Sequence, residues 1–132
     1  MTKVFGDTFY FLALLNKRDE AHDKAVEYAA CIEQLVTTEW VLTELADGLA
    51  SSRQREMFLK TRQELLDDGD VLVVPLDMEL YDEGINLFAS RPDKDWSLTD
   101  CISFVVMRRE GLSEALTGDH HFEQAGFIVL LK

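Results

Sequence analysis

Long apolar runs, cysteine and proline are all scarce in this sequence of 132 residues. No apolar run approaches the ~20 residues that a membrane-spanning helix requires, so we expect no transmembrane segment and no membrane partner. Asp7 interrupts the early apolar stretch and no small-residue cleavage site follows it, so we expect no signal peptide. The two cysteines, Cys31 and Cys101, form no spaced motif. We therefore expect a cytoplasmic protein with two reduced, mostly buried thiols.

Basic residues are also in short supply, with 13 Lys and Arg against 25 Asp and Glu and a formal net charge of −12. Proteins that bind nucleic acid usually carry a basic surface, so we expect weak intrinsic affinity for nucleic acid. The one basic-leaning stretch contains Arg53, Arg55, Lys60 and Arg62. A solvated helix face is its simplest interpretation, and substrate-phosphate contact through Arg53 and Arg55 is the alternative.

Strand-like and helix-like patterns alternate along the chain, without a repeat, a low-complexity segment or a linker. Apolar periodicity predicts strands near residues 3–7, 36, 71–74, 115–117 and 127–131. Two helices are expected in each of the first three intervals and a short helical turn in the last. This order predicts an α/β fold, with a parallel sheet of four or five strands sandwiched by helices. A hydrophobic content of 47% supports a core, and we expect one domain over residues 1–132.

Two apolar segments indicate where the interior of this fold lies. The run 71–74 reads Val-Leu-Val-Val, which is typical of a strand whose two faces are both covered. The helix body 101–107 is apolar on nearly every side, which indicates a central position rather than a peripheral one.

Four acidic residues lie at predicted strand ends or helix starts, where parallel α/β sheets carry their functional groups. Asp7 and Asp119 follow predicted strands, and Glu44 and Asp100 lie in the first turns of predicted helices. Ligands of open α/β sheets bind at the carboxyl ends of the strands, so we expect Asp7 and Asp119 at adjacent strand ends. Carboxylates gathered in one cleft repel each other, which predicts a raised pKa for at least one of them. Mg²⁺ or Mn²⁺, which prefer oxygen ligands, would relieve that repulsion and activate water.

Each acidic residue also has a purely structural interpretation. Asp7 is a possible helix N-cap, and Glu44 is a possible solvated residue on a helix flank. Ser97 and Asp100 form a Ser-x-x-Asp capping-box pattern that requires no catalysis. Asp119 is placed to cap the turn that follows it. The case for a metal site therefore depends on all four acids together.

Four segments around these acids carry a family resemblance. They resemble, in family order, the acidic motifs of the PIN domain family, and the third is the most specific. The segments are Val4-Phe5-Gly6-Asp7-Thr8, Trp40-Val41-Leu42-Thr43-Glu44-Leu45, Trp96-Ser97-Leu98-Thr99-Asp100-Cys101-Ile102-Ser103-Phe104 and Leu116-Thr117-Gly118-Asp119-His120-His121-Phe122. Together they span nearly the whole chain.

The resemblance implies a PIN-like fold and a Mg²⁺- or Mn²⁺-dependent endoribonuclease, and within the family the chain resembles the VapC-type toxins. For that branch it also implies an RNA substrate, a small antitoxin protein as partner, and a homodimer. Motif position assigns the catalytic and metal-binding site to Asp7, Glu44, Asp100 and Asp119. Thr8 and Ser97 would orient carboxylates or waters. The acidic composition departs from the basic, substrate-facing surface of the family.

Other site chemistries fit less well. Zinc binding by His120 and His121 is disfavoured because adjacent histidines point in different directions and lack ligand spacing. A receiver-like phosphorylation domain would need paired acids after the first strand, where Asp7 stands alone, and a lysine after the last strand, where Lys132 is terminal. A phosphatase with a nucleophilic aspartate would need a second Asp at the position of Phe9. A catalytically silent PIN-like interaction module is the main alternative, and stabilisation by Mn²⁺ would distinguish it from an enzyme.

Overall fold

The protein, seen in a computed structural model that describes residues 2–132, is built around a five-stranded sheet. Its elements are β1 Lys3–Gly6, α1 Thr8–Leu15, α2 His22–Cys31, β2 Gln34–Thr38, α3 Glu39–Gly48, α4 Arg55–Asp67, β3 Val71–Val74, α5 Met78–Ser90, α6 Leu98–Arg109, β4 Glu114–Leu116, α7 His120–Gln124 and β5 Ile128–Val129. This succession of strands and helices agrees with the sequence-based prediction.

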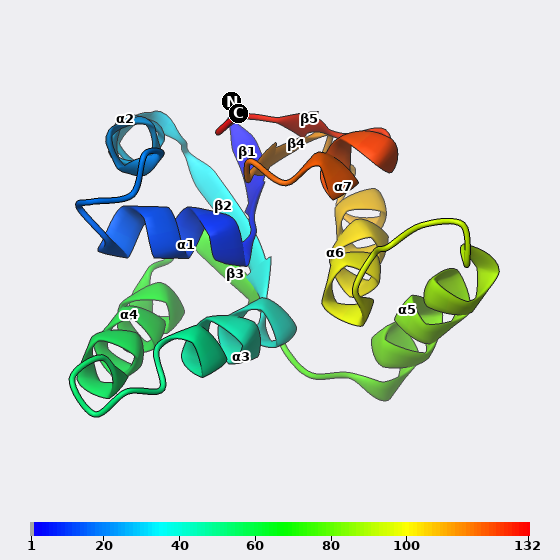
Figure 1. Cartoon of the computed structure of the whole chain (residues 1–132), viewed down its shortest axis with the longest axis horizontal. Helices are drawn as coiled ribbons and strands as arrows, with labels where there is room; N and C mark the ends of the chain where they lie inside the picture. Colours follow the sequence, from blue (N-terminus) through cyan, green and yellow to red (C-terminus); the bar gives the residue numbers. More distant parts are fainter. Residues whose placement is uncertain (1) are drawn as a thin grey trace.

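The sheet has the strand order β3-β2-β1-β4-β5, and every neighbouring pair is parallel. In Figure 1, α1, α2 and α4 lie on one side of the sheet and α5 and α6 on the other. Parallel strands require crossover connections, and the helices between them supply these connections and cover the sheet. The predicted α/β sandwich is confirmed.

The strand order determines where the acidic residues meet. The central strand β1 pairs with β2 on one side and with β4 on the other. Gly6 is in register with Leu116, so the chain leaves both strands at the same edge of the sheet. Asp7 directly follows β1, and Asp119 lies just beyond β4. The expected placement of these two acids at adjacent strand ends is therefore confirmed.

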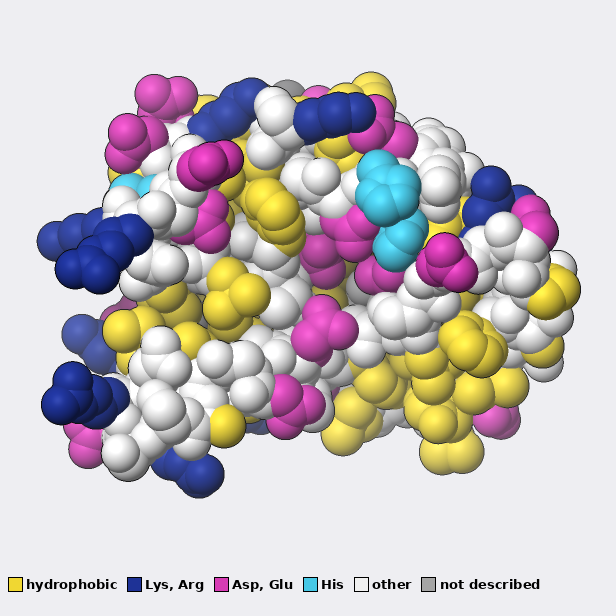
Figure 2. Space-filling model, in the orientation of Figure 1, with side chains coloured by type: hydrophobic (Ala, Val, Ile, Leu, Met, Phe, Trp, Pro, Cys, Tyr) yellow, Lys and Arg dark blue, Asp and Glu magenta, His cyan; other side chains and the backbone are white. Residues whose placement is uncertain are grey.

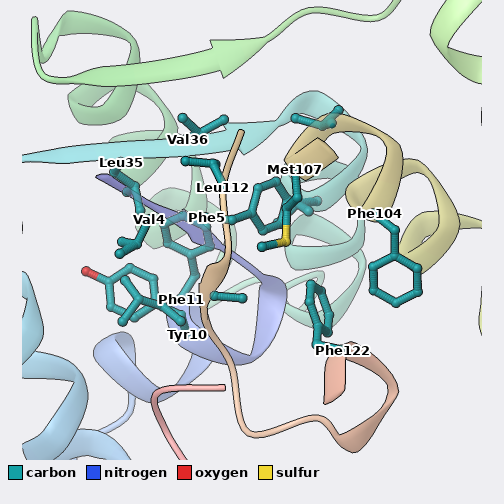
Figure 3. Packing of buried hydrophobic residues seen from close by; sticks show 14 of the residues in the cluster. Val4, Phe5, Tyr10, Phe11, Leu35, Val36, Phe104, Met107, Leu112 and Phe122 are labelled. Atoms are coloured by element: carbon teal, nitrogen blue, oxygen red, sulfur yellow. The ribbon is translucent and has the colours of Figure 1, made fainter. Parts of the chain in front are cut away.

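The core lies between the central strands and the helices that cover them. Figure 3 shows the rings of Phe5 and Phe11 beside β1, with Phe122 on the opposite side of the cluster next to Met107. Helix α6 is buried on most of its faces, as its apolar sequence predicts. Phe104 of this helix makes edge-to-face contacts with Phe122 and Trp96, at centroid distances of 4.9 and 5.0 Å. These contacts fix α6, and with it the helix start that carries an acidic residue.

Two expectations about burial are wrong. Strand β3 is the edge of the sheet rather than a strand covered on both faces, and Leu72 within it is 44% exposed. Cys31 is exposed at the end of α2, whereas Cys101 is buried as expected. In both cases the surrounding elements, and not the local sequence, decide exposure. Among residues 2–132, every helix is too short or too polar to cross a membrane.

Candidate active site

The structure brings the four predicted acids into one cleft, here called the acidic cleft. It has a volume of about 520 Å³ and is lined by Asp7, Glu44, Asp100 and Asp119, together with Thr8, Phe9, Asp95, Ser97 and His121. Figure 2 shows this hollow as a cluster of acidic and histidine side chains near the middle of the face. The acids come from four elements that are distant in sequence, so the fold alone assembles them.

Asp7 is the most deeply buried acid of the cleft, with 5% of its surface exposed. Its side chain does not cap α1; it accepts a hydrogen bond of 2.9 Å from the Thr117 hydroxyl. The pKa of Asp7 is raised to about 7, mainly by burial and also by the nearby charges of Asp100 and Glu44, although the Thr117 hydrogen bond acts to lower it. The expected raised pKa is confirmed, but its main cause is burial rather than repulsion between carboxylates.

Asp100 has both a structural and a site-facing role. Its carboxylate accepts from the Ser97 backbone N–H at 3.2 Å, and the Ser97 hydroxyl accepts from the Asp100 N–H at 3.0 Å. This reciprocal capping box starts α6. The same carboxylate oxygen lies 3.2 Å from Nδ1 of His121. Burial raises the pKa of Asp100, and the charge of Asp119 adds to this effect.

Glu44 is exposed on α3, yet its carboxylate is held at the cleft. The hydroxyl of Thr8 donates a hydrogen bond of 2.5 Å to Glu44 Oε1. Thr8 is the first residue of α1 and directly follows Asp7, so the residue next to one acid holds the carboxylate of another. The contact agrees with the role expected of Thr8 in orienting a carboxylate.

Asp119 caps the short helix α7 and has two histidines beside it. Its carboxylate accepts from the His121 backbone N–H at 2.9 Å. Nδ1 of His121 lies 3.4 Å, and Nδ1 of His120 lies 3.7 Å, from Asp119 Oδ1. The two imidazole rings are 4.4 Å apart, so the argument that adjacent histidines must point in different directions is wrong here. Within residues 2–132, Asp119, His120 and His121 are the group whose possible ligand atoms all lie within 4.8 Å of one another.

Sequence reasoning missed three residues at this site. Thr117 donates to Asp7 and also accepts from the backbone N–H of Asp119 at 3.1 Å, so one hydroxyl connects two strand ends. Asp95 and Phe9 line the cleft as well. The spacing of Thr117, two residues before Asp119, was the one available signal. The other two positions become recognisable only when the chain is folded.

The two candidate substrate residues Arg53 and Arg55 lie elsewhere. Arg55 begins α4 and its guanidinium donates to the Ala50 carbonyl at 2.8 Å. It lines a separate hollow between α3 and α4 with Phe58 and Leu59. Arg53 is exposed in the preceding loop. Neither arginine belongs to the acidic cleft, and their contact with substrate stays a prediction.

Comparisons with known proteins agree with this architecture. The VapC20 toxin of Mycobacterium tuberculosis, described as cleaving the sarcin–ricin loop, is 25% identical, with a TM-score of 0.84 over 95% of this chain and 96% of that chain. A chain of VapBC2 from Rickettsia felis, bound to a promoter DNA fragment, is 14% identical with a TM-score of 0.68, each chain being covered to 97%. A chain of DNA-bound VapBC from Salmonella typhimurium is 16% identical, with a TM-score of 0.66 over 98% of this chain and 97% of that chain.

The comparison with curated proteins and the comparison with family models give different results. No curated protein matches the sequence significantly. Residues 4–128, however, match the PIN domain family, and this range includes all four acids of the cleft and the five-stranded sheet except for its first and last residues. On this match and on the shared architecture, the chain belongs to the PIN domain family, and its fold is of the VapC type.

Proposed function

We propose that this PIN domain is a Mg²⁺- or Mn²⁺-dependent endoribonuclease and the toxin of a toxin–antitoxin pair. The observation that carries the proposal is the acidic cleft, in which four carboxylates from four separate elements surround one hollow. We place the protein in the cytoplasm, and the domain over residues 1–132. A silent interaction module would have no need to keep the Asp7 carboxylate buried, where its charge is costly.

The donor set of the cleft fits a hard divalent cation. Asp7, Glu44, Asp100 and Asp119 offer oxygen ligands, and these are the residues that we propose to hold the metal. No three of these carboxylates have ligand atoms that all lie within 4.8 Å of one another, unlike the group of Asp119 with the two histidines. This wider spacing is compatible with an ion that keeps several of its waters. When bound, such an ion would lower the pKa of a water and stabilise charge on the phosphodiester.

Three hydrogen bonds position carboxylates of the cleft. Thr117 holds the Asp7 carboxylate by its hydroxyl, and Thr8 holds that of Glu44. The Ser97 backbone N–H holds that of Asp100. Because hydrogen bonds to the ionised form favour it, each contact prepares a carboxylate to bind a cation. We expect the loss of one such contact to weaken metal binding or activity by roughly 10–100-fold.

Stabilisation by Mn²⁺ is the first test of this proposal. A metal that binds the native state but not the unfolded chain must raise the melting temperature. At a hundredfold excess over Kd, it adds about 2.7 kcal/mol to the free energy of unfolding. We expect Mn²⁺ to raise the Tm of the wild-type protein and to leave that of D7N nearly unchanged. As a control, D82N alters an exposed acid on α5 outside the cleft and should respond like wild type. A wild-type Tm that is insensitive to Mn²⁺ would favour the silent module.

We expect the net charge to make RNA binding weak, and added salt to weaken it further. Basic side chains supply most non-specific affinity for RNA, and the chain has 13 of them against 25 acids. The divalent ion then becomes the main positive charge of the cleft. The sequence of the RNA target is a separate question, which cleavage mapping on total cellular RNA would answer.

We further propose an antitoxin partner and a homodimer. The solved structures that resemble this fold include VapBC assemblies and a toxin–antitoxin complex, and an acidic cleft favours charge-assisted contacts with Arg or Lys. We expect a small antitoxin whose inhibitory segment inserts at least one Arg into the cleft and displaces the metal. Co-purification after expression with and without the neighbouring gene tests this expectation. A protein that is harmless alone and binds no neighbour-encoded partner would contradict it.

A further inference from the structure

A second hollow adjoins the acidic cleft and shares one side chain with it. It has a volume of about 510 Å³, within the range of ligand pockets, and lies between the start of α2 and the C-terminal residues. Its lining includes Phe9, Leu131, Lys24 and Lys132, and also the acids Asp19 and Glu20. We call it the Phe9–lysine hollow. Phe9 lines the acidic cleft too, so the two hollows share this residue.

The backbone of Gly118 holds the Phe9 ring in place between the two hollows. A Cβ at Gly118 would lie 2.6 Å from Phe9 Cζ and 3.0 and 3.1 Å from its two Cε atoms. The outer end of the ring therefore occupies the space that a side chain at residue 118 would fill. Gly118 precedes Asp119, so the ring is anchored directly beside one of the acids of the cleft.

The two hollows differ in charge. The acidic cleft has five carboxylates in its lining, whereas the Phe9–lysine hollow has two lysines and two acids. The Lys24 ammonium donates to the Lys132 carbonyl at 3.1 Å and, with three donors, keeps two for a ligand. The Lys132 ammonium pairs with Glu123 at 2.7 Å and is still 66% exposed. The Asp19 carboxylate already accepts from the Ala21 N–H, so part of the negative charge is engaged locally.

Proteins bind the nucleotides of single-stranded RNA with aromatic rings and basic side chains that lie close together. Bases that are not paired stack on aromatic side chains, and lysines contact the adjoining phosphates. In Figure 2, Lys and Arg side chains lie along the upper edge of the face that carries the acidic cleft. We propose that the Phe9–lysine hollow binds the nucleotide next to the cleaved phosphodiester, with its base on Phe9 and its phosphate near Lys24 and Lys132. This proposal rests on the proposed RNA cleavage.

Kinetics of the full chain with Mn²⁺ and a fluorescently labelled single-stranded RNA oligonucleotide of mixed sequence test the subsite. F9L keeps an apolar side chain against the core but cannot stack, and we expect its KM to rise about tenfold or more with little change in kcat. F9Y keeps the ring and should restore the wild-type KM. F88A removes an aromatic ring that is 49% exposed on α5, outside both hollows, and serves as the matched control.

The lysines have an independent readout in the salt dependence. Each phosphate contact to a single strand contributes about 0.7 to the slope of log affinity against log salt. We expect K24Q to lower the slope of log KM by about this amount, whereas K60Q, an exposed lysine on α4 that lines neither hollow, leaves it unchanged. This measurement decides the question even if F9L fails to fold.

The outcomes separate this proposal from the proposed function. An active wild type with an unchanged KM in F9L and an unchanged slope in K24Q would overturn the subsite alone. A wild type that neither binds Mn²⁺ nor cleaves RNA would overturn both proposals. If F9L and K24Q cleave RNA normally but lose co-purification with the neighbour-encoded protein, the hollow is an antitoxin site and not an RNA subsite.

Discussion

Replacing Asp7 with asparagine is expected to stabilise the metal-free protein at pH 8 by about 1–3 kcal/mol, while abolishing its response to Mn²⁺ and its RNA cleavage. The reason is that burial raises the pKa of Asp7 to about 7, from an ordinary value of 3.8. At pH 8 the native protein must therefore keep a charge in a site that is 5% exposed. Asparagine removes that charge and retains an oxygen that can accept from Thr117.

The sign of this effect fixes its dependence on pH. Below about pH 4 Asp7 is protonated in both the folded and the unfolded chain, so the carboxyl group carries little penalty. Between about pH 4 and pH 7 the unfolded chain has lost a proton that the native state still holds, so the contribution of Asp7 to stability falls as the pH rises. The stability difference between D7N and wild type should therefore be small at pH 4 and largest at pH 8.

Urea unfolding with EDTA at both pH values, followed by melting with Mn²⁺, measures this prediction. D82N, an exposed acid on α5, controls for the loss of one negative charge in a protein of net charge −12. Equal stabilisation by D7N and D82N at pH 8 would mean that general charge repulsion, and not the burial of Asp7, is responsible. A D7N protein that is less stable than wild type at pH 8 would contradict the prediction directly.

The order of elements was predictable because it depends on local periodicity. Apolar runs and caps identify β1 to β5 and the helices between them, and the Thr38 hydroxyl caps α3 by accepting from the N–H of Val41. Exposure at the sheet edge was not predictable in the same way. The run Val71–Val74 has the composition of a covered strand, but the strand order places it at the edge. Nothing within those residues specifies which strand becomes the last one.

The candidate site was predictable in part for a similar reason. Motif order and strand ends indicated Asp7 and Asp119, but the connection between them is a hydrogen bond from Thr117, 110 residues from Asp7 in sequence. Phe9 occupies the second position of α1 and reads as an ordinary core residue. Its place between two hollows depends on Gly118, and only the pairing of β1 with β4 brings the two together.

The pair S97A and D100N is expected to separate the two roles of the capping box. S97A removes the hydroxyl that accepts from the Asp100 N–H, which should cost about 0.5–2 kcal/mol of stability. The Ser97 backbone N–H, which holds the carboxylate of Asp100, is unchanged by that substitution. Cleavage measured well below the Tm should therefore remain close to that of wild type.

D100N should have the opposite profile. Asparagine keeps an oxygen that can accept from the Ser97 N–H, so α6 still starts at the same place and the Tm of the metal-free protein changes by only a few degrees. The lost negative charge removes a proposed metal ligand, and activity should fall by more than the roughly 10–100-fold that an outer partner costs. Thermal melting and cleavage rates on the same preparations provide the comparison. If D100N unfolds while S97A retains its Tm, Asp100 acts mainly by starting α6, and its assignment to the metal site would have to be withdrawn.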